Sequence, residues 1–267
     1  MIKAASFSII VVFLLSIMRC SGSRETQPVL QIEEDTTTSD IVEIDSVSFK
    51  GLKFYYPPTA SIGLFVGEEP DTSNFYISYC CAAAYTGQSI YWHQGPANHT
   101  DVAGDHIEGG KLFRGYVEDN NTGGFVVYPY PDFHWEIVDS PAFIQRISSE
   151  TRPITAFQQE LLILNGEIQK FKRPDLPRLY RALCNFNGRL CVVDGTHEHL
   201  LSSFIDLLHN AGIEDALYLD MGNWSYSWYR EYQEGLDIEW SSAKLIHPKP
   251  QHGKYYGSNW LAFYIVN

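Results

Sequence analysis

The stretch RALCNFNGRLCVVDG, residues 181–195, holds an Asn-Gly pair between two apolar runs. Asn-Gly in this setting is the strongest short-range signal for a β-hairpin with a two-residue loop. In such a hairpin the residue numbers of two paired positions always add up to the same value. Cys184 should therefore face Cys191, and Arg181 should face Asp194. Strand alternation then puts Arg181 and Asp194 on one face at the open end of the hairpin, where the cation and the carboxylate are expected in contact.

The two opposed cysteines are compatible with two structures. Opposed residues of an antiparallel pair have Cα atoms about 4.5–5.5 Å apart, within the range that a disulfide spans. A Cys184–Cys191 bridge would therefore suit an oxidising compartment. Two small buried thiols on one strand face fit the same pattern.

The segment after the hairpin is predicted to be a helix. Apolar residues recur with a period of 3.6 from Glu198 to Asn210, which indicates an amphipathic helix with one buried face. Thr196 is placed to cap its start, and Gly212 is placed to end it.

A second apolar run, Ala216 to Leu219, follows this helix and ends at Asp220. The strand, helix and strand together predict a β-α-β unit whose crossover returns the chain to a parallel neighbour. Asp194 and Asp220 should then emerge at the same carboxyl edge of the sheet, where ligands tend to bind.

The rest of the chain indicates further strands. Four short runs, GLFVG, NFYISYCCAAAY, GGFVVYPY and FHWEIV, are rich in β-branched and aromatic residues and are bounded by turn residues. Another helix is indicated around Ser140 to Ser148. The predicted fold class is therefore α+β, with a mixed, strand-rich sheet, a β-α-β unit near the C-terminus and helices packed on the sheet.

The composition excludes one class of partner. The 267 residues carry 19 Lys and Arg against 32 Asp and Glu, a formal net charge of -13. A charge of this sign repels phosphate backbones, which argues against nucleic acid as a partner. The 45% of hydrophobic residues are enough to bury a large core, so one generous domain is expected.

The first 20 residues are expected to be an export segment. Lys3 precedes an apolar run, Ala4 to Met18, that is shorter than the ~20 residues that a membrane span needs. Cys20 and the small polar residues after it resemble a bacterial lipoprotein signal, in which Cys20 would carry the lipid. Residues 21–45 are predicted to be an acidic polar tether, and residues 46–267 a single domain. The expected location is the cell envelope, in the periplasm or on the outer surface.

Several of these motifs resemble one known family. Arg181-Ala182 before the Asn-Gly hairpin, VVDG after it, and ALYLDMG with Ser225 nearby are similar to the phosphodiester glycosidase family. Its animal member removes N-acetylglucosamine from capped mannose 6-phosphate. The similarity is clearest over residues 156–228 and extends more weakly to the closing NWLAFYIV. It implies a divergent bacterial member of that family, a hydrolase whose domain spans the whole folded part of the chain.

Two motifs and one residue depart from the family pattern, the residue being Thr196, which follows Asp194-Gly195 where the family usually has an arginine. The family's Leu-Asp-Gly-Gly-Gly-Ser is LDMGNWS here, residues 219–225, so larger side chains replace part of the glycine turn. The family's earlier Asn-Gly-Gly-Phe-Phe is matched at best by CAAAY, residues 81–85, without the asparagine. These departures favour, as an alternative, a non-catalytic carbohydrate-binding envelope protein on the same fold.

The chemistry that the resemblance implies assigns roles to the sheet edge. Hydrolysis of a sugar-1-phosphodiester needs carboxylates at an oxocarbenium-like centre and positive donors at the leaving phosphate. Arg181 is the candidate for a bidentate phosphate contact. Asp220 and Asp194 are candidates for nucleophile, general base or metal ligand, or Asp194 only orients Arg181. Capping of a helix or turn just after a strand is the structural alternative for both aspartates.

A glycine-rich segment, residues 98–115, adds three candidates. Asp105 beside His106 is suited to orient an imidazole for acid-base catalysis or to bind a divalent ion. Lys111 is a candidate substrate contact. Such irregular loops often carry function, but a structural histidine fits the same pattern.

The aromatic segment after Asp220 adds candidate sugar contacts. Trp224 and Tyr226 are candidate platforms for sugar faces, and Ser225 is a candidate polar partner beside them. Core packing competes with this interpretation, because aromatic side chains bury large areas and dominate cores.

Together these features predict an exported glycosidase that hydrolyses a sugar-1-phosphodiester or a related envelope glycan. The expected ligand is a carbohydrate or a sugar phosphate, and the membrane is expected to be contacted only through a lipid at Cys20. A calcium or magnesium ion is compatible with the predicted carboxylates.

Overall fold

The computed structural model describes residues 41–42, 45–66, 69–84, 103–115, 119–129, 131–220, 227–230, 232–233, 244–247 and 259–265. The predicted export segment and most of the predicted tether lie outside these residues. Strand β2 begins at Asp45, one residue before the predicted start of the domain, and the short strand β1 lies in the last part of the predicted tether.

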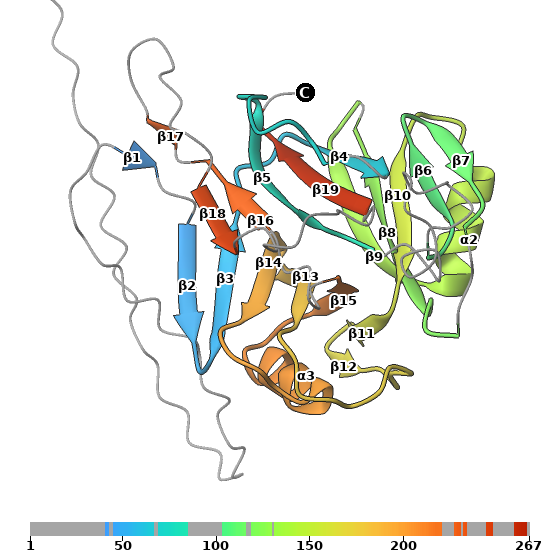
Figure 1. Ribbon diagram of the computed structural model, residues 1–267. Coiled ribbons are helices and arrows are strands. Elements are labelled where there is room, and N and C mark those ends of the chain that lie inside the picture. The colour runs from blue at the N-terminus through green and yellow to red at the C-terminus, as the bar shows by residue number, and fades with distance from the viewer. Residues whose placement is uncertain are drawn as a thin grey trace, which may run out of the picture. The chain divides into compact units, whose positions relative to one another are not determined.

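The elements of the described residues are shown in Figure 1. The strands are β1 (Ile41–Val42), β2 (Asp45–Phe49), β3 (Leu52–Tyr56), β4 (Ser61–Val66), β5 (Ile77–Ala82), β6 (His106–Glu108), β7 (Lys111–Phe113), β8 (Gly123–Tyr128), β9 (His134–Asp139), β10 (Thr155–Gln159), β11 (Leu161–Leu164), β12 (Glu167–Ile168), β13 (Arg181–Phe186), β14 (Arg189–Gly195), β15 (Asp215–Leu219), β16 (Ser227–Tyr229), β17 (Tyr232–Gln233), β18 (Lys244–His247) and β19 (Asn259–Tyr264). The helices are α2 (Ser140–Ser149) and α3 (Leu201–Asn210).

These strands form three large sheets and one strand pair. The seven-stranded sheet has the order β12-β11-β15-β13-β14-β3-β2. A five-stranded sheet, here the β5 sheet, has the order β18-β16-β5-β19-β4, and another, the β8 sheet, has the order β7-β6-β10-β8-β9. Strands β1 and β17 pair separately.

The predicted α+β fold class is wrong, because the described chain is dominated by strands. Each strand pairing that the structure describes is antiparallel, and two helices accompany them. Antiparallel strands can connect through short turns and need no helical crossover, which is consistent with the few helices among the described residues.

The hairpin register predicted from the Asn-Gly pair is confirmed. Arg181 pairs with Asp194, and Cys184 pairs with Cys191. Asn187 and Gly188 both have positive φ, 52° and 74°, as the type I′ turn that suits a two-residue hairpin requires.

The predicted β-α-β unit is only partly correct. Strands β14 and β15 run in the same direction, because each is antiparallel to β13. They are not neighbours, however, since β13 lies between them and the other edge of β14 is paired with β3. The hairpin partner occupies the position that a parallel neighbour would need, so β15 pairs with the free edge of β13.

Both helices that the periodicity indicated are present. Helix α3 buries Leu201, Phe204, Ile205 and Leu208, and the chain leaves it through Gly212 at φ 88°. The predicted cap at Thr196 is wrong, because the chain first forms a bridge between Arg178 and His199 and the helix starts after Leu200.

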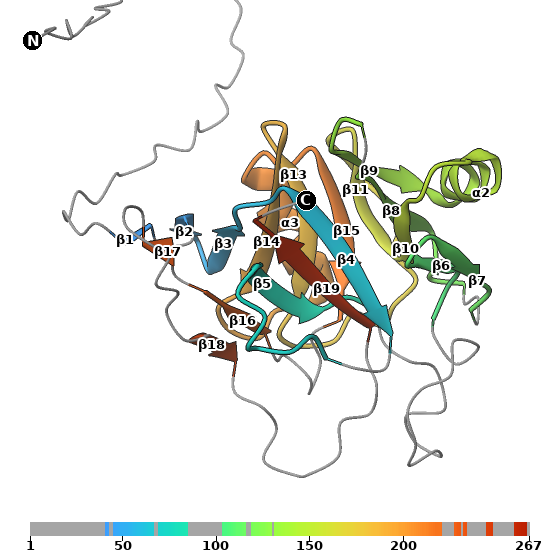
Figure 2. The ribbon, with the colours of Figure 1, turned by 90° about the horizontal axis from the view of Figure 1, so that it is seen from above.

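Helix α2 starts after Asp139, whose side chain accepts a hydrogen bond from the backbone N–H of Ala142 at 2.8 Å. It packs on the β8 sheet through Phe143 and Ile147. Figure 2 shows this helix beside β8 and β9. Among the described residues, no helix is long and apolar enough to cross a membrane.

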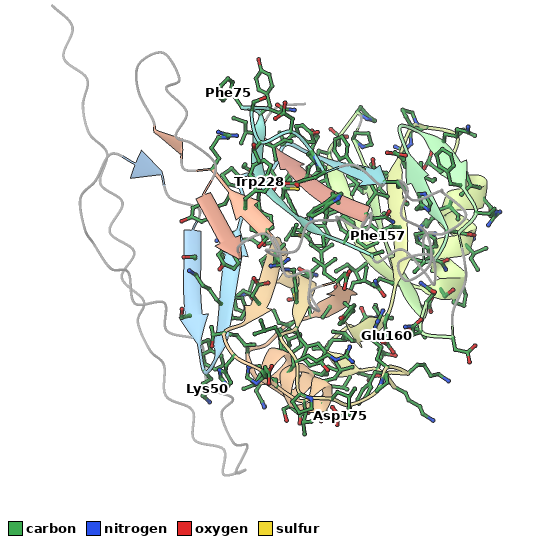
Figure 3. The ribbon with its side chains drawn as sticks, in the orientation of Figure 1. Lys50, Phe75, Phe157, Glu160, Asp175 and Trp228 are labelled. Atoms are coloured by element: carbon green, nitrogen blue, oxygen red, sulfur yellow. The ribbon has the colours of Figure 1, made fainter. Side chains whose placement is uncertain are left out.

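The main core lies where the inner faces of the three large sheets meet. Leu183 and Leu217 come from the seven-stranded sheet, Tyr79 and Leu261 from the β5 sheet and Phe157 from the β8 sheet. All five are buried, and Phe157 is labelled in Figure 3. A polar residue on these inner faces is therefore taken out of water and needs a partner.

Candidate functional site

A buried ion pair lies at the open end of the β13–β14 hairpin. The Nε of Arg181 donates to Oδ1 of Asp194 at 2.6 Å, and Nη2 donates to Oδ2 at 2.9 Å. The two side chains are 0% and 4% exposed. This two-point contact fixes the guanidinium plane and engages both carboxylate oxygens.

The same guanidinium joins two sheets. Nη2 of Arg181 also donates to Oγ of Ser227 at 2.8 Å, and Ser227 is the first residue of β16 in the β5 sheet. Ser227 pairs with Cys81 of β5, so the contact ties the seven-stranded sheet to the β5 sheet across the core. The sequence placed Ser227 in a polar and aromatic segment but did not predict this partner.

A second cation lies in the same row of the sheet. Asp194 pairs with Lys53 of β3 on one side and with Arg181 on the other, and Arg181 pairs in turn with Leu219. Opposed residues share a face, so two cations flank one carboxylate. Lys53, which the sequence did not single out, also lies over the ring of Tyr55, 5.1 Å from the ring centroid.

Asp220 follows this row directly. It comes one residue after Leu219, and its backbone N–H donates to the carbonyl of Ala83 at 2.8 Å. The residue is 8% exposed. Asp194, near the end of β14, and Asp220, directly after β15, thus lie on the two sides of Arg181 at the same end of the sheet.

The surroundings of this edge shift the pKa values of its titratable groups. Burial is the largest single influence on the Arg181 guanidinium and lowers its pKa, but the charge and hydrogen bond of Asp194, together with Tyr79 and Cys81, raise the pKa well above its usual value. Burial raises the pKa of the neighbouring Tyr79 hydroxyl and raises that of the Cys81 thiol to about 12. Arg181 is therefore charged at neutral pH, while Tyr79 and Cys81 are neutral.

Sequence reasoning also missed a buried amide on the strand that pairs with Ala83, the residue whose carbonyl accepts from Asp220. Asn259, the first residue of β19, is 0% exposed, and neither Oδ1 nor Nδ2 has a hydrogen-bond partner in the part of the chain that the structure describes. An unpaired buried amide group costs about 1–3 kcal/mol. A single Asn within the run NWLAFY carries no local signal that would have identified it.

The structure places Asp105, His106 and Lys111 in a different sheet from Arg181. Asp105 forms an ion pair with Arg114 and precedes β6 of the β8 sheet. His106 is buried, and its ring stacks on Phe113 at 5.4 Å. Figure 1 shows β6 and β7 away from β13. The predicted site roles of Asp105, His106 and Lys111 stay predictions. The contacts described here for Asp105 and His106 are structural.

Lys111 is exposed on β7. Its ammonium lies over the ring of Phe113, 4.9 Å from the centroid. This contact covers an aromatic face at the surface of the β8 sheet.

Three predicted substrate contacts, Trp224, Ser225 and Tyr226, lie outside the described residues. Of the same aromatic segment, Trp228 is 0% exposed and packs with Ile77 and Trp260 on the outer face of the β5 sheet. Figure 3 labels Trp228 there. For Trp228, core packing is therefore the correct interpretation.

The opposed cysteines have free thiols. Cys184 and Cys191 are both buried. Burial raises the pKa of Cys184 well above its usual value, and a hydrogen bond with Cys191 adds to the shift. The structure thus contains the second of the two arrangements that the sequence allowed.

A calcium or magnesium ion would need several oxygen ligands. In the described ranges, no group of three or more His, Cys, Asp or Glu side chains is arranged to hold an ion. Asp194 also commits both oxygens to Arg181. The described residues at this edge do not form a divalent-cation site by themselves.

Another buried ion pair fastens the chain where it passes from β10 to β11. Glu160 is 0% exposed, accepts hydrogen bonds from the backbone N–H groups of Lys172 and Arg173, and lies 2.9 Å from Nε of Arg173. Figure 3 labels Glu160. Its partners come from one irregular segment, so we assign this pair to folding.

A cavity of about 470 Å³ opens near the turn end of β13. Phe133 and Trp135 line it together with Asn185 and Asp215. Oδ2 of Asp215 accepts from Nδ2 of Asn185, and Oδ1 accepts from the backbone N–H of Asn165, both at 2.9 Å. Because these polar side chains hold strands together, we assign them to folding.

No family model matches the sequence, and no curated protein matches it. Among solved structures, the fold is similar to the catalytic domain of zebrafish N-acetylglucosamine-1-phosphodiester alpha-N-acetylglucosaminidase, auto-inhibited by its pro-peptide. The identity is 12% and the TM-score 0.45, over 86% of this chain and 85% of that one. A hypothetical protein from Synechocystis is similar at 12% identity and a TM-score of 0.42, over 82% of this chain and 60% of that one. Both are distant similarities of fold.

Proposed function

We propose that this chain is an exported glycosidase that hydrolyses a sugar-1-phosphodiester or a related envelope glycan. The observation that carries the proposal is the row of Arg181, Asp194 and Lys53 at one end of the seven-stranded sheet, next to an opposed sheet, with Asp220 directly after Leu219, the residue that pairs with Arg181. Each comes from a different strand or strand end. Burying a charge costs free energy. Buried charged groups with strongly shifted pKa values cluster at functional sites.

The geometry divides the roles of the two aspartates. Both oxygens of Asp194 are engaged by Arg181, so Asp194 acts as the residue that positions the guanidinium. Asp220 is then the carboxylate at the anomeric centre, either as nucleophile or as the general base that takes a proton from water. The anomeric carbon forms a bond to the Asp220 carboxylate, which water later hydrolyses, or to the oxygen of the water that Asp220 deprotonates; the carbon–oxygen bond to phosphate breaks, and its electron pair leaves on the phosphate oxygen.

The two cations, Arg181 and Lys53, stabilise the leaving phosphate. Arg181 and Lys53 carry two positive charges in the row that holds one negative charge, Asp194. A leaving phosphate gains negative charge as the bond breaks, and fixed cations stabilise such charge more in a buried site than in water. This arrangement suits a phosphodiester better than a neutral glycoside.

The test is release of sugar from a panel of sugar-1-phosphodiesters by the purified chain, with and without added calcium or magnesium. Asp220→Asn should remain folded and lose at least 100-fold in kcat/KM, since a positioned acid or base contributes typically about 10²–10⁴-fold. The anomeric configuration of the product separates the two roles of Asp220, because a nucleophile retains it and a general base inverts it.

Two results would contradict the proposal. Turnover that persists in a folded Asp220→Asn would place the chemistry elsewhere. Glycan binding without turnover by the unaltered chain would instead establish the carbohydrate-binding alternative, which the full engagement of Asp194 by Arg181 favours.

Export and a lipid at Cys20 belong to the same proposal. Expression of the full chain in a bacterium, followed by fractionation and mass measurement, should give an envelope protein cleaved before Cys20 and carrying acyl chains. A soluble, unmodified chain that retains residues 1–20 would refute this part without bearing on the chemistry.

A further inference from the structure

The inner face of the β5 sheet carries a polar residue that its fold does not use. Asn259 belongs to the same strand face as Leu261 and Phe263, two residues of the main core. It is 0% exposed, and within the described residues both polar atoms of its side chain lack a partner. An apolar side chain at this position would avoid that cost.

The strand does not depend on this amide. The backbone N–H of Asn259 donates to the carbonyl of Ala84 at 2.9 Å, and its carbonyl accepts from the N–H of Ala83 at 2.7 Å. These bonds are available to any residue except proline in the donor position. Buried polar groups of native proteins are nearly always paired, so an unpaired one points to a group that arrives from outside.

The position of Asn259 connects it to the proposed site. Ala83 accepts a backbone hydrogen bond from Asp220 at 2.8 Å and donates one to Asn259, so Asp220 and Asn259 flank the same residue. The inner face of this sheet also presents Ser227, which contacts Arg181. The sheet register therefore places the amide beside the edge that holds the charged row.

A second unpaired group lies on the same inner face. The hydroxyl of Tyr79 is buried and has no hydrogen-bond partner among the residues that the structure describes. Tyr79 is within electrostatic reach of both Arg181 and Asp194. Tyr79 and Asn259 are thus two polar side chains near the charged row without a hydrogen-bond partner among the described residues. The amide of Asn259 offers a donor and an acceptor side by side.

We propose that Asn259 is a ligand-binding residue of this site and that its amide contacts hydroxyl groups of a saccharide. The amide Oδ1 accepts from one hydroxyl while Nδ2 donates to its neighbour, a pairing that adjacent hydroxyls of a sugar ring satisfy. The inference rests on the proposed function, since it assigns Asn259 to the sugar of the same substrate. A sugar that pairs both atoms removes the penalty of the empty site, which favours sugars over apolar ligands.

The experiment compares Asn259→Leu with the unaltered chain in two measurements. Binding of a panel of hexose 1-phosphates and N-acetylhexosamine 1-phosphates is followed by calorimetry, and unfolding is followed in urea. We expect binding to weaken at least 10-fold while the unfolding midpoint stays the same or rises, because the leucine removes unpaired polar atoms without removing a bond.

Asn185→Leu is the matched control. Nδ2 of Asn185 donates to Asp215 at 2.9 Å, near the turn end of β13 and away from the charged row. This variant should lower the unfolding midpoint and leave binding unchanged. The opposite pattern in Asn259→Leu, weaker binding without lost stability, is a result that a merely structural asparagine would not produce.

The inference is overturned if Asn259→Leu binds the probes as the unaltered chain does, if it loses stability as Asn185→Leu does, or if the unaltered chain binds none of the probes. Its failure is distinguishable from failure of the proposed function. Turnover that depends on Asp220 but not on Asn259 would remove only the inference, and binding that depends on Asn259 without any turnover would remove only the enzyme.

Discussion

Breaking the Arg181–Asp194 pair should be one of the most destabilising single changes in this protein. Asp194→Asn preserves the shape of the side chain but removes the charge that compensates a guanidinium with 0% exposure. Removal of one partner of a buried ion pair costs about 3–5 kcal/mol, because the other charge stays buried and uncompensated. Domains of this size lose about 2–4 °C in Tm per kcal/mol, so the expected shift is about 6–20 °C.

The assay is urea unfolding followed by the fluorescence of the six tryptophans. Urea is preferred to guanidinium, which is a salt and screens charges. The set contains Asp194→Asn, Arg181→Met and the double variant Arg181→Met/Asp194→Leu. The double variant should lose less stability than either single variant, since it leaves no buried charge behind. Unchanged m-values would show that stability and not the unfolded state has changed.

Glu150→Gln is the control for this set. Glu150 pairs with Arg152 at 2.8 Å on the surface, and exposed pairs of this kind contribute little. Its unfolding midpoint should stay close to that of the unaltered chain. Single losses at Arg181 and Asp194 of less than about 1 kcal/mol, or a double variant that loses the sum of both, would refute the reasoning on buried charge.

Three further predictions concern the stability of the fold. Gly188→Ala should lower the free energy of unfolding by about 1–2 kcal/mol, because Gly188 has φ 74° and a side chain is strained in that conformation. No atom lies within 4 Å of the added Cβ, so the cost comes from the backbone alone. Thermal unfolding measures this change, and a neutral result would contradict the turn assignment. Gly124→Ala should cost about 1–3 kcal/mol through overpacking, since its Cβ would collide with the ring of Phe143, and adding Phe143→Leu should restore part of the loss. Burial, followed by the charge of His197, lowers the pKa of His199, so the unfolded chain binds this proton at higher pH than the native chain does. Stability should therefore fall as the pH drops from about 7 to 5, and His199→Gln should reduce that fall in denaturation measured across this range.

Local sequence patterns determined the pieces of this fold. The Asn-Gly pair decided the register of the β13–β14 hairpin, because a two-residue turn with positive φ leaves only one pairing. That register alone brought Arg181 and Asp194 together. The 3.6-residue periodicity likewise located α3 through its buried face. Each of these features depends on residues that are close along the chain.

The arrangement of the pieces was decided by contacts between distant residues. A helix between two strands running the same way suggested a parallel pair, yet β15 pairs with β13 because the hairpin already occupied that edge of β14. The α+β prediction failed because antiparallel strands, which need no helical crossover, dominate the described chain. Sheet order depends on which edges remain free after local hairpins form, and single-chain patterns do not contain that information.

The site itself combines both kinds of information. The sequence by itself determined that Arg181 meets Asp194 and that Asp220 ends a neighbouring apolar run. Only the tertiary structure placed Lys53 beside Asp194, brought Ser227 onto the guanidinium from another sheet, and left the amide of Asn259 buried next to the backbone that also holds Asp220. The physical reason is that a turn and a strand period act over a few residues, whereas the burial of a polar group is set by whatever sheet packs against it.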